Sequence, residues 1–264
     1  MRILITNDDG ARAPGIKLLE EIARSFTDDV WIVAPEFDQS GVSHAISLHE
    51  PLRVHHEGEK RYFVRGTPAD CVILAVEHLM DGKPDLVLSG VNRGGNMADS
   101  IAYSGTVGAA MTALTVGVPA MALSQYFQGT EVKWECARAY AKPLIERLLE
   151  VKWPSSVVPN INFPHRAPGE IAGVKLCHPG HGFISGVNVV ERVDVRGLSY
   201  HWLQFRRAAE DIDDPECDIS LLRDGYITIT PLRPDRHGEW NWGDMRAEFG
   251  DLLTVAPLAD LSGD

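Results

Sequence analysis

Short apolar segments alternate with amphipathic ones through residues 1–125, and this alternation restricts the fold more than any other feature of the sequence. The segments 1–6, 30–34, 85–89 and 119–123 are apolar and have the length of buried strands, and helical stripes lie between them. Strands that alternate with helices form a parallel sheet covered on both faces. The sequence therefore predicts an α/β protein with a mainly parallel sheet.

The remaining segments extend this prediction. Helices are expected where a proline opens an apolar stripe or the stripe itself has a helical period: from Pro14, from Pro68, over 106–116 and over 132–149. Further strands are expected over 157–163 and 226–230, and a hairpin over 52–65. Residues 170–205 alternate apolar and polar side chains, which is typical of antiparallel strands.

The composition narrows the class of protein. Hydrophobic residues make up 44% of the 264, charged residues 23%, and the formal charge is 25 − 37 = −12. This acidity argues against general binding to nucleic acid or to anionic membranes. No apolar run approaches the roughly 18 residues of a membrane helix. Six acidic residues and no basic ones lie in 210–218, and we expect them in a solvated loop.

The cysteines and the N-terminus indicate the compartment. The four cysteines lie far apart and form no CxxC pair, which favours reduced thiols over disulfides or a zinc site: Cys71, Cys136, Cys177 and Cys217. The apolar run after Met1 is too short for a secretory signal. We therefore expect a cytoplasmic protein.

Polar residues follow three of the predicted strands. Asn7-Asp8-Asp9-Gly10 follows the first strand, at the sheet edge where open α/β sheets bind ligands. Two carboxylates that converge there repel each other unless a cation lies between them, and oxygen ligands suit Mg²⁺ or Mn²⁺. The alternative is that one aspartate caps the next helix and the other lies in solvent.

The other two strand ends add neutral ligands and an anion site. Ser40-Gly41 follows the second strand, and Asn92 and Asn96 lie in a glycine-rich loop after the third. Ser104-Gly105-Thr106 then opens a helix, whose free amides attract phosphate. Each of these segments could equally be an ordinary polar loop or a helix cap. There is no GxGxxG or GxxxxGK[ST] motif, so a dinucleotide or P-loop site is not expected.

Taken in order, the motifs of this chain resemble the SurE family of survival proteins. The matching segments run over nearly the whole sequence: Ile5–Gly10, Ala13–Gly15, Val33–Pro35, Gln39–Gly41, Gly66–Cys71, Ser89–Asn92, Tyr103–Thr106 and Ile229–Leu232. Members of that family are metal-dependent acid phosphatases that act on nucleoside monophosphates. The resemblance therefore implies a 5′-nucleotidase, with 3′-monophosphates and short polyphosphate as further substrates to test.

The resemblance also implies roles for particular residues. One divalent metal ion, Mg²⁺ or Mn²⁺, would be bound by Asp8, Asp9, Ser40 and Asn92. The phosphate would be bound by Asn96, Ser104, Gly105 and Thr106. Asp8 and Asp9 would be catalytic, and Asp8 is favoured as the acceptor of the water proton. Arg93 stands where the family often has a smaller or neutral residue, and it would contact phosphate or face water.

The implied fold is a Rossmann-like three-layer α/β/α sandwich forming a single domain over 1–264. Its core would comprise 1–125, 155–180 and 225–232, with a projecting hairpin at 183–205 and a divergent tail at 233–264. The hairpin and the tail would make a homodimer or homotetramer.

Two other functions remain open from the residues. One is an aspartyl-phosphate phosphatase with Asp8 as nucleophile, although those enzymes usually separate their two aspartates by one residue. The other is a nucleotide-sensing module that binds without hydrolysis. The sequence leaves the base preference open.

Overall fold

The computed structural model describes residues 1–151, 153–207 and 213–235. The chain divides into two units, Met1–Pro234 and Asp235–Asp264, and the fold described below is that of the first. Most of the predicted tail, from residue 236 onward, lies outside the described residues. Among the described helices, none has both the length and the apolar character needed to span a bilayer.

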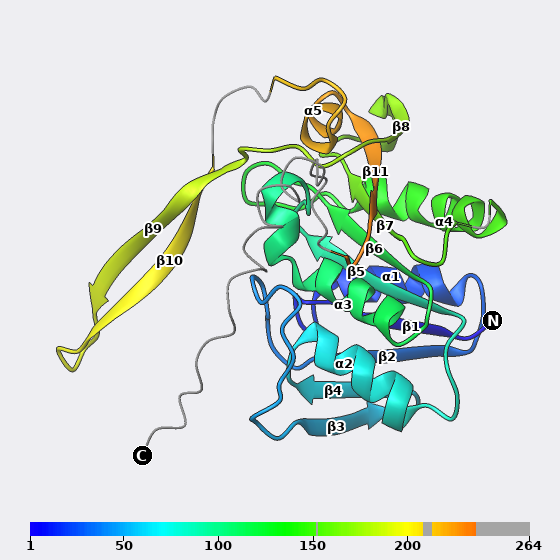
Figure 1. The fold of residues 1–264 in the computed structure, drawn as a ribbon, viewed down its shortest axis with the longest axis horizontal. Coiled ribbons are helices and arrows are strands. Elements are labelled where there is room, and N and C mark those ends of the chain that lie inside the picture. The colour runs from blue at the N-terminus through cyan, green and yellow to red at the C-terminus, as the bar shows by residue number, and fades with distance from the viewer. Residues whose placement is uncertain (152, 208–212, 236–264) are drawn as a thin grey trace, which may run out of the picture. The chain divides into compact units, whose positions relative to one another are not determined.

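The described residues form a nine-stranded sheet (Figure 1). Its strands follow one another across the sheet in the order β3 (Arg53–Gly58), β4 (Arg61–Arg65), β2 (Val30–Pro35), β1 (Ile3–Thr6), β5 (Leu86–Arg93), β6 (Ala120–Gln125), β7 (Val158–Phe163), β11 (Tyr226–Leu232) and β8 (Gly173–Leu176). The strands from β4 to β7 are parallel to one another, whereas β3 pairs antiparallel with β4 and β11 pairs antiparallel with β7. The predicted parallel α/β sheet is confirmed.

Helices cover both faces of this sheet. In β1, Ile3 and Ile5 belong to one apolar cluster and Leu4 belongs to the other, because successive side chains of a strand point to opposite faces. The first cluster includes the apolar stripes of α1 (Pro14–Arg24) and α4 (Glu135–Glu150). The second includes those of α2 (Pro68–Leu74) and α3 (Gly105–Thr115). The three-layer α/β/α arrangement follows from this double burial.

The order of the strands places a switch point beside β1. The chain passes from β1 to β2 on one side and later returns to β5 on the other. The loops after β1 and β5 therefore leave the same sheet edge in opposite directions, and such a point leaves room for a ligand. Asp8 and Asn92 come from these two strand ends.

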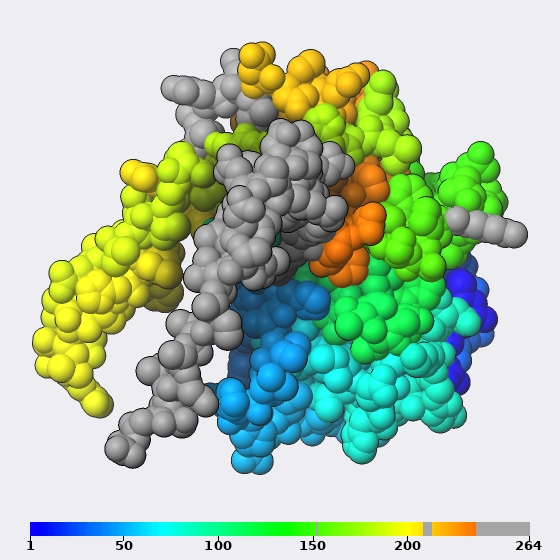
Figure 2. Space-filling model, in the orientation of Figure 1, coloured from blue at the N-terminus to red at the C-terminus, as the bar shows by residue number. Residues whose placement is uncertain are grey.

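The predicted hairpin is confirmed as β9 (Ile184–Val193) paired with β10 (Ser199–Arg207). It extends away from the sheet and its helices as a two-stranded arm, drawn yellow in Figures 1 and 2. Most of its side chains are exposed, Trp202 and Leu203 among them. The prediction for 170–205 is wrong for β8, which joins the main sheet parallel to β11.

The expected solvated loop at 210–218 also needs correction. Glu210 and Asp211 lie outside the described residues. Asp218 is fully buried at the start of α5 (Asp218–Arg223), and its carboxylate accepts hydrogen bonds from the backbone amides of Ala98 and Gly180, both at 2.9 Å. Backbone amides supply the partners that a buried carboxylate needs, so an acidic run does not have to be solvated throughout.

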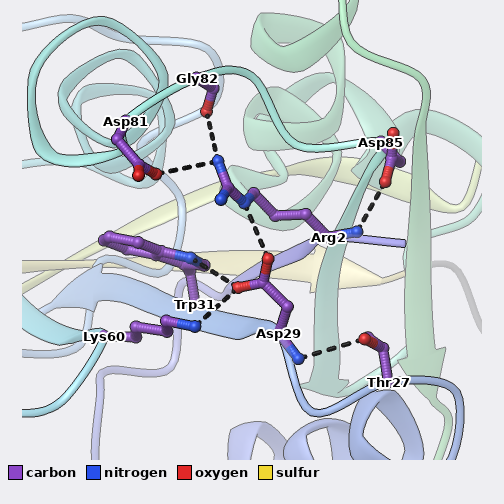
Figure 3. A network of polar contacts seen from close by, with 8 residues as sticks. All are labelled: Arg2, Thr27, Asp29, Trp31, Lys60, Asp81, Gly82 and Asp85. Atoms are coloured by element: carbon purple, nitrogen blue, oxygen red, sulfur yellow. Dashed lines mark hydrogen bonds and ion pairs between the residues drawn. The ribbon is translucent and has the colours of Figure 1, made fainter.

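A polar network lies at the opposite edge of the sheet, where the strands begin (Figure 3). Asp29 accepts hydrogen bonds from Arg2 and Lys60, each at 2.9 Å, and from the Trp31 indole at 3.1 Å. The hydrogen bonds from Lys60 and then from Arg2, together with their positive charges, lower the pKa of Asp29 to about 2. The network connects the residues before β1 and β2 to Lys60 in the turn before β4.

Candidate active site

Asp8 and Asp9 follow β1 directly, as predicted, but their side chains have different surroundings. Asp8 is buried, with 4% of its surface exposed, and it lines a cleft. Asp9 is half-buried, and its Oδ2 accepts a hydrogen bond of 2.8 Å from the backbone amide of Arg93. The turn after the strand thus lets two adjacent carboxylates lie at the same sheet edge without sharing the same partners.

The start of α3 packs directly against Asp8. The Thr106 hydroxyl donates a 2.5 Å hydrogen bond to Asp8 Oδ1. A Cβ atom on Gly105 would lie only 2.8 Å from Asp8 Cβ, so a larger residue there would push the helix away from the carboxylate. Ser104 caps the helix by accepting a 3.0 Å hydrogen bond from the amide of Val107. The Ser-Gly-Thr sequence therefore brings the positive end of a helix to a buried carboxylate.

The charges of the two aspartates are poorly compensated. Burial raises the pKa of Asp8, and hydrogen bonds from Thr106 oppose that shift. Burial, and then repulsion by Asp8, raise the pKa of Asp9 to about 7. Among the described residues, no lysine or arginine forms an ion pair with either carboxylate. A bound cation would relieve this unfavourable energy.

Asn92 lies near the end of β5, at the same edge of the sheet, and β5 is longer than predicted. The predicted strand ends at Ser89, whereas β5 continues to Arg93 and its pairing with β6 shifts register between Ser89 and Asn92. Gly90 has a φ of +132°, and a Cβ there would lie 2.2 Å from the carbonyl oxygen of Leu123. Irregularities of this kind redirect side chains near functional sites. The Asn92 amide nitrogen donates to the carbonyl of Gly94, which leaves the side-chain oxygen available as a ligand.

Ser40 belongs to the loop after β2 and lines the same cleft as Asp8 and Asn92. Its backbone amide donates a 2.7 Å hydrogen bond to Asp38 Oδ1, and the amide of the neighbouring Gln39 donates to the carbonyl of Asp8. The first bond lies within the loop after β2, and the second joins that loop to the loop after β1. The Ser40 side chain belongs to an exposed residue and is accessible to a ligand.

Asn96 is held by residues that sequence reasoning missed. Its amide nitrogen donates to the Ser124 hydroxyl at 2.8 Å, and its backbone amide donates to Asn162 Oδ1 at 2.8 Å. The side-chain amides of Asn160 and Asn162 both donate to the Asn96 carbonyl, at 2.7 and 3.0 Å. Two buried asparagines on one face of β7 were a signal in the sequence, because a strand core rarely accepts unpaired amides.

The tertiary structure brings most of the predicted residues to one cleft of about 540 Å³. Five of the eight line it: Asp8, Ser40, Asn92, Asn96 and Ser104. The other three lie beside it, with Gly105 and Thr106 against Asp8 and with Asp9 on the amide of Arg93. Within the described part of the chain, no group of three or more His, Cys, Asp or Glu side chains is placed to hold a metal ion.

The donor set nevertheless fits one hard cation. It consists of two carboxylates, a hydroxyl and an amide oxygen, and Mg²⁺ and Mn²⁺ prefer such oxygen ligands. Mg²⁺ is commonly bound through only one or two carboxylates, and waters and substrate phosphate complete its shell. The raised pKa values of Asp8 and Asp9 agree with a site that lacks its positive charge.

These features define an α/β protein with an oxygen-rich ligand cleft at the switch point of its sheet. Comparison with known proteins gives a more specific answer. The family model described as survival protein SurE matches residues 3–185. The chain is 49% identical over 251 residues to the 5′-nucleotidase SurE 1 of Burkholderia lata, an alignment that covers 94% of this chain and 96% of the relative. The chain belongs to the SurE family.

Other relatives agree over almost their full length. The 5′-nucleotidase SurE of Brucella canis is 48% identical over 259 residues, covering 97% of this chain and 99% of the relative. The crystal structure of the SurE protein from Aquifex aeolicus superposes with a TM-score of 0.79 at 31% identity, covering 96% of this chain and 100% of the other. The family and the fold predicted from the sequence motifs are therefore confirmed.

Proposed function

We propose that this protein is a metal-dependent phosphomonoesterase that hydrolyses nucleoside 5′-monophosphates to nucleoside and phosphate. The observation that carries this proposal is the meeting of Asp8, Asn92, Ser40 and the start of α3 at one cleft. Relatives named 5′-nucleotidase share about half of this sequence over nearly the whole chain, which supports the same reaction here. The SurE nucleotidases are metal-dependent in general.

The metal ligands that we propose are Asp8, Asp9, Ser40 and Asn92, for one ion of Mg²⁺ or Mn²⁺ per subunit. When bound, such an ion polarises the phosphate and acidifies a water molecule. The raised pKa values of the two carboxylates support a cation at this position, because they show how unfavourable the two negative charges are by themselves.

The protein's own groups have separate tasks in this proposal. Asp8 is the better candidate for accepting the water proton, because it lines the cleft whereas Asp9 lies beside it. Asn96 and the Ser104-Gly105-Thr106 helix start bind the phosphate and stabilise the charge of the transferring phosphoryl group. The side-chain amides of Asn160 and Asn162 fix the backbone of Asn96 by donating hydrogen bonds to its carbonyl. These roles need little motion of the protein, since the groups are already hydrogen-bonded in place.

Assembly and location are also proposals. The exposed apolar side chains of the β9–β10 arm support a homodimer or homotetramer, because an exposed apolar surface usually marks an interface: Val187, Val189, Trp202 and Leu203. Four free cysteines, three of them buried, support the predicted cytoplasmic location.

The proposed function is tested by phosphate release from AMP and GMP, with Mn²⁺ or Mg²⁺ and with EDTA. We expect turnover to require the metal and Asp8→Asn to lower it by at least about 10²–10³-fold, the cost of losing one electrostatic donor in other enzymes. Asp28→Asn is the matched control, because that exposed carboxylate lies at the opposite sheet edge. Unchanged turnover in Asp8→Asn would contradict the proposal. Nucleotide binding without phosphate release would favour a sensing module, and a burst of phosphoenzyme would favour Asp8 as nucleophile.

A further inference from the structure

The loop between β2 and β3 carries Ser40, and burial contributes little to holding it in place. The loop spans residues 36–52 and contains no helix or strand, which makes it longer than most connections in compact domains. None of its residues is buried, and the apolar side chains of Ile46 and Leu48 keep 46% and 76% of their surface exposed. The position of this loop therefore depends on its hydrogen bonds to neighbouring segments.

Ser40 lies at the tip of a four-residue turn, Gln39–Val42. The amide of Val42 donates to the carbonyl of Gln39 at 3.4 Å, and Gly41 has a φ of +84°. A positive φ at the third residue of a tight turn is the conformation that glycine adopts most easily. No atom lies within 4 Å of a Cβ placed on Gly41, so packing at that residue does not orient the turn.

Hydrogen bonds anchor this turn on both sides. Before the turn, the amide of Gln39 donates to the carbonyl of Asp8 at 2.7 Å. After it, the amide of Ser43 donates to the carbonyl of Tyr103 at 3.0 Å, and the Ser43 hydroxyl donates to the carbonyl of Ala102 at 2.6 Å. Ala102 and Tyr103 are the last two residues before the N-cap of α3. The first anchor thus leads to the carboxylates, and the second leads to the helix start assigned to phosphate.

The backbone of Ser43 is held in an unusual conformation. Its φ is +57°, in the left-handed region that residues other than glycine rarely adopt. Such a conformation persists where the surrounding contacts fix it, and it is found mainly at functional sites. Gly108 of α3 supplies a further contact, because a Cβ there would lie only 2.3 Å from the Ser43 carbonyl oxygen. The loop and the helix therefore pack backbone to backbone at Ser43.

We propose that Ser43 is a positioning residue that fixes the turn presenting Ser40 to the metal. Its bonds to the residues before α3 also set the spacing between that ligand and the phosphate-binding helix start. This inference rests on the proposed function, in which Ser40 is a metal ligand. Ser43 does not line the cleft, so its effect passes through Ser40.

The test measures Mn²⁺ affinity without substrate, from the electron paramagnetic resonance signal of free Mn²⁺. Ser43→Gly removes the hydroxyl, whereas it tolerates the positive φ and retains the backbone amide. Loss of a group that orients a metal ligand costs about 10–100-fold in affinity, and we expect about 10-fold because Ser43 acts through a turn. Excess Mn²⁺ should restore AMP turnover in this variant, because the bound ion then holds Ser40 in place.

A double-mutant cycle separates positioning from a general effect on the fold. Ser40→Ala should lower Mn²⁺ affinity by removing the ligand itself. In that background Ser43→Gly should cause little further loss, because no ligand remains for Ser43 to position. A residue that only stabilises the fold would lower the affinity by the same factor in both backgrounds.

A second variant changes the same contact from the helix side. The new methyl group of Gly108→Ala would push the Ser43 carbonyl away without removing a hydrogen-bond donor, so we expect a similar loss of Mn²⁺ affinity. This variant also keeps the test open if Ser43→Gly does not fold. Ser25→Gly is the matched control, because the Ser25 hydroxyl donates a 2.6 Å hydrogen bond to the carbonyl of Ile22 at the end of α1 and lies outside the cleft.

Each result has a definite meaning. Wild-type Mn²⁺ affinity in both Ser43→Gly and Gly108→Ala would overturn the positioning role, and so would an equal loss with and without Ser40. If the wild type bound no Mn²⁺, or if Ser40→Ala bound it as well as the wild type, the proposed metal site would fail and this inference with it. A protein that binds Mn²⁺ but releases no phosphate from nucleotides would contradict only the proposed reaction, because the affinity test uses no substrate.

Discussion

The aspartates at the edge of the central sheet where the strands begin and those at the edge where the strands end lie in opposite electrostatic environments. At the edge where strands begin, Asp29 is surrounded by Arg2, Lys60 and the Trp31 indole, and its pKa falls to about 2. At the edge where strands end, Asp8 and Asp9 lie beside each other, and burial raises the pKa of both. The same residue type is thus stabilised as an anion at one edge and destabilised as an anion at the other.

This difference separates a structural role from a functional one. The Asp29 network is complete within the protein, so it stabilises the fold without any ligand (Figure 3). The pair at the other edge is incomplete, because hydrogen bonds from Thr106 and Arg93 only partly offset two buried negative charges. Strongly perturbed carboxylates in a cleft are typical of functional sites. The comparison predicts that changes at one edge affect activity and changes at the other affect stability.

The largest expected effect is on the geometry of the catalytic edge. In Gly105→Ala the new methyl group would clash with Asp8, and Asp8 or the start of α3 must move. A displacement of about 1 Å in an active site can cost roughly 100-fold in rate, so we expect a loss of that order in kcat for AMP. Steady-state kinetics with Mn²⁺ measures it.

Gly169→Ala provides the control for this change. No atom lies within 4 Å of a Cβ placed on Gly169, and its φ is not in the left-handed region. We expect Gly169→Ala to retain wild-type activity. If Gly105→Ala also retained it, the close packing of α3 on Asp8 would not matter for catalysis.

A metal should stabilise the protein in a way that depends on pH. Between the unfolded pKa of Asp9, near 4, and its folded pKa of about 7, the folded state holds a proton that the unfolded state has lost. Without metal, stability therefore falls as pH rises through this window. A cation binds the deprotonated pair, so we expect Mn²⁺ to raise the unfolding temperature more at pH 8 than at pH 5.

The expected size of this shift follows from mass action. Ligand at 100 times its Kd adds about 2.7 kcal/mol, which corresponds to about 5–10 °C for a protein of this size. Thermal unfolding with Mn²⁺ and with EDTA at both pH values measures it. Asp9→Asn should reduce the difference between the two pH values, and equal shifts in the wild type would argue against a cation at this pair.

The smallest expected effect is at the structural edge. Asp29→Asn removes the ion pairs with Arg2 and Lys60, and partly exposed pairs of this kind contribute up to about 1 kcal/mol each. We expect an unfolding temperature a few degrees lower at pH 7, with kcat for AMP unchanged.

The pH dependence of that loss has a definite sign. The folded pKa of Asp29 lies below its unfolded value, so its contribution is present above pH 4 and disappears as pH falls toward 2. Thermal unfolding of wild type and Asp29→Asn should therefore converge in acid. A large fall in activity in Asp29→Asn would show that the two edges are not independent.

The residue pattern alone predicted the mainly parallel α/β fold and the positions of its core strands. Apolar runs such as 30–34 and the stripe that begins at Pro14 specify strands and helices locally, and the motif order identified the SurE family. A parallel strand that is buried on both faces has a continuous apolar sequence. These strands could therefore be predicted from the sequence.

Only the tertiary structure decided which polar residues meet and what surrounds them. Three features depend on neighbours that are far away in sequence. They are the extension of β5 to Arg93, the burial of Asp218, and the hydrogen bonds from Asn160 and Asn162 to Asn96. The hydrogen bond from Ser43 to Ala102 likewise joins residues 59 positions apart. Local patterns record whether a side chain is apolar or polar, but burial and hydrogen bonding depend on contacts that form only when distant segments pack together.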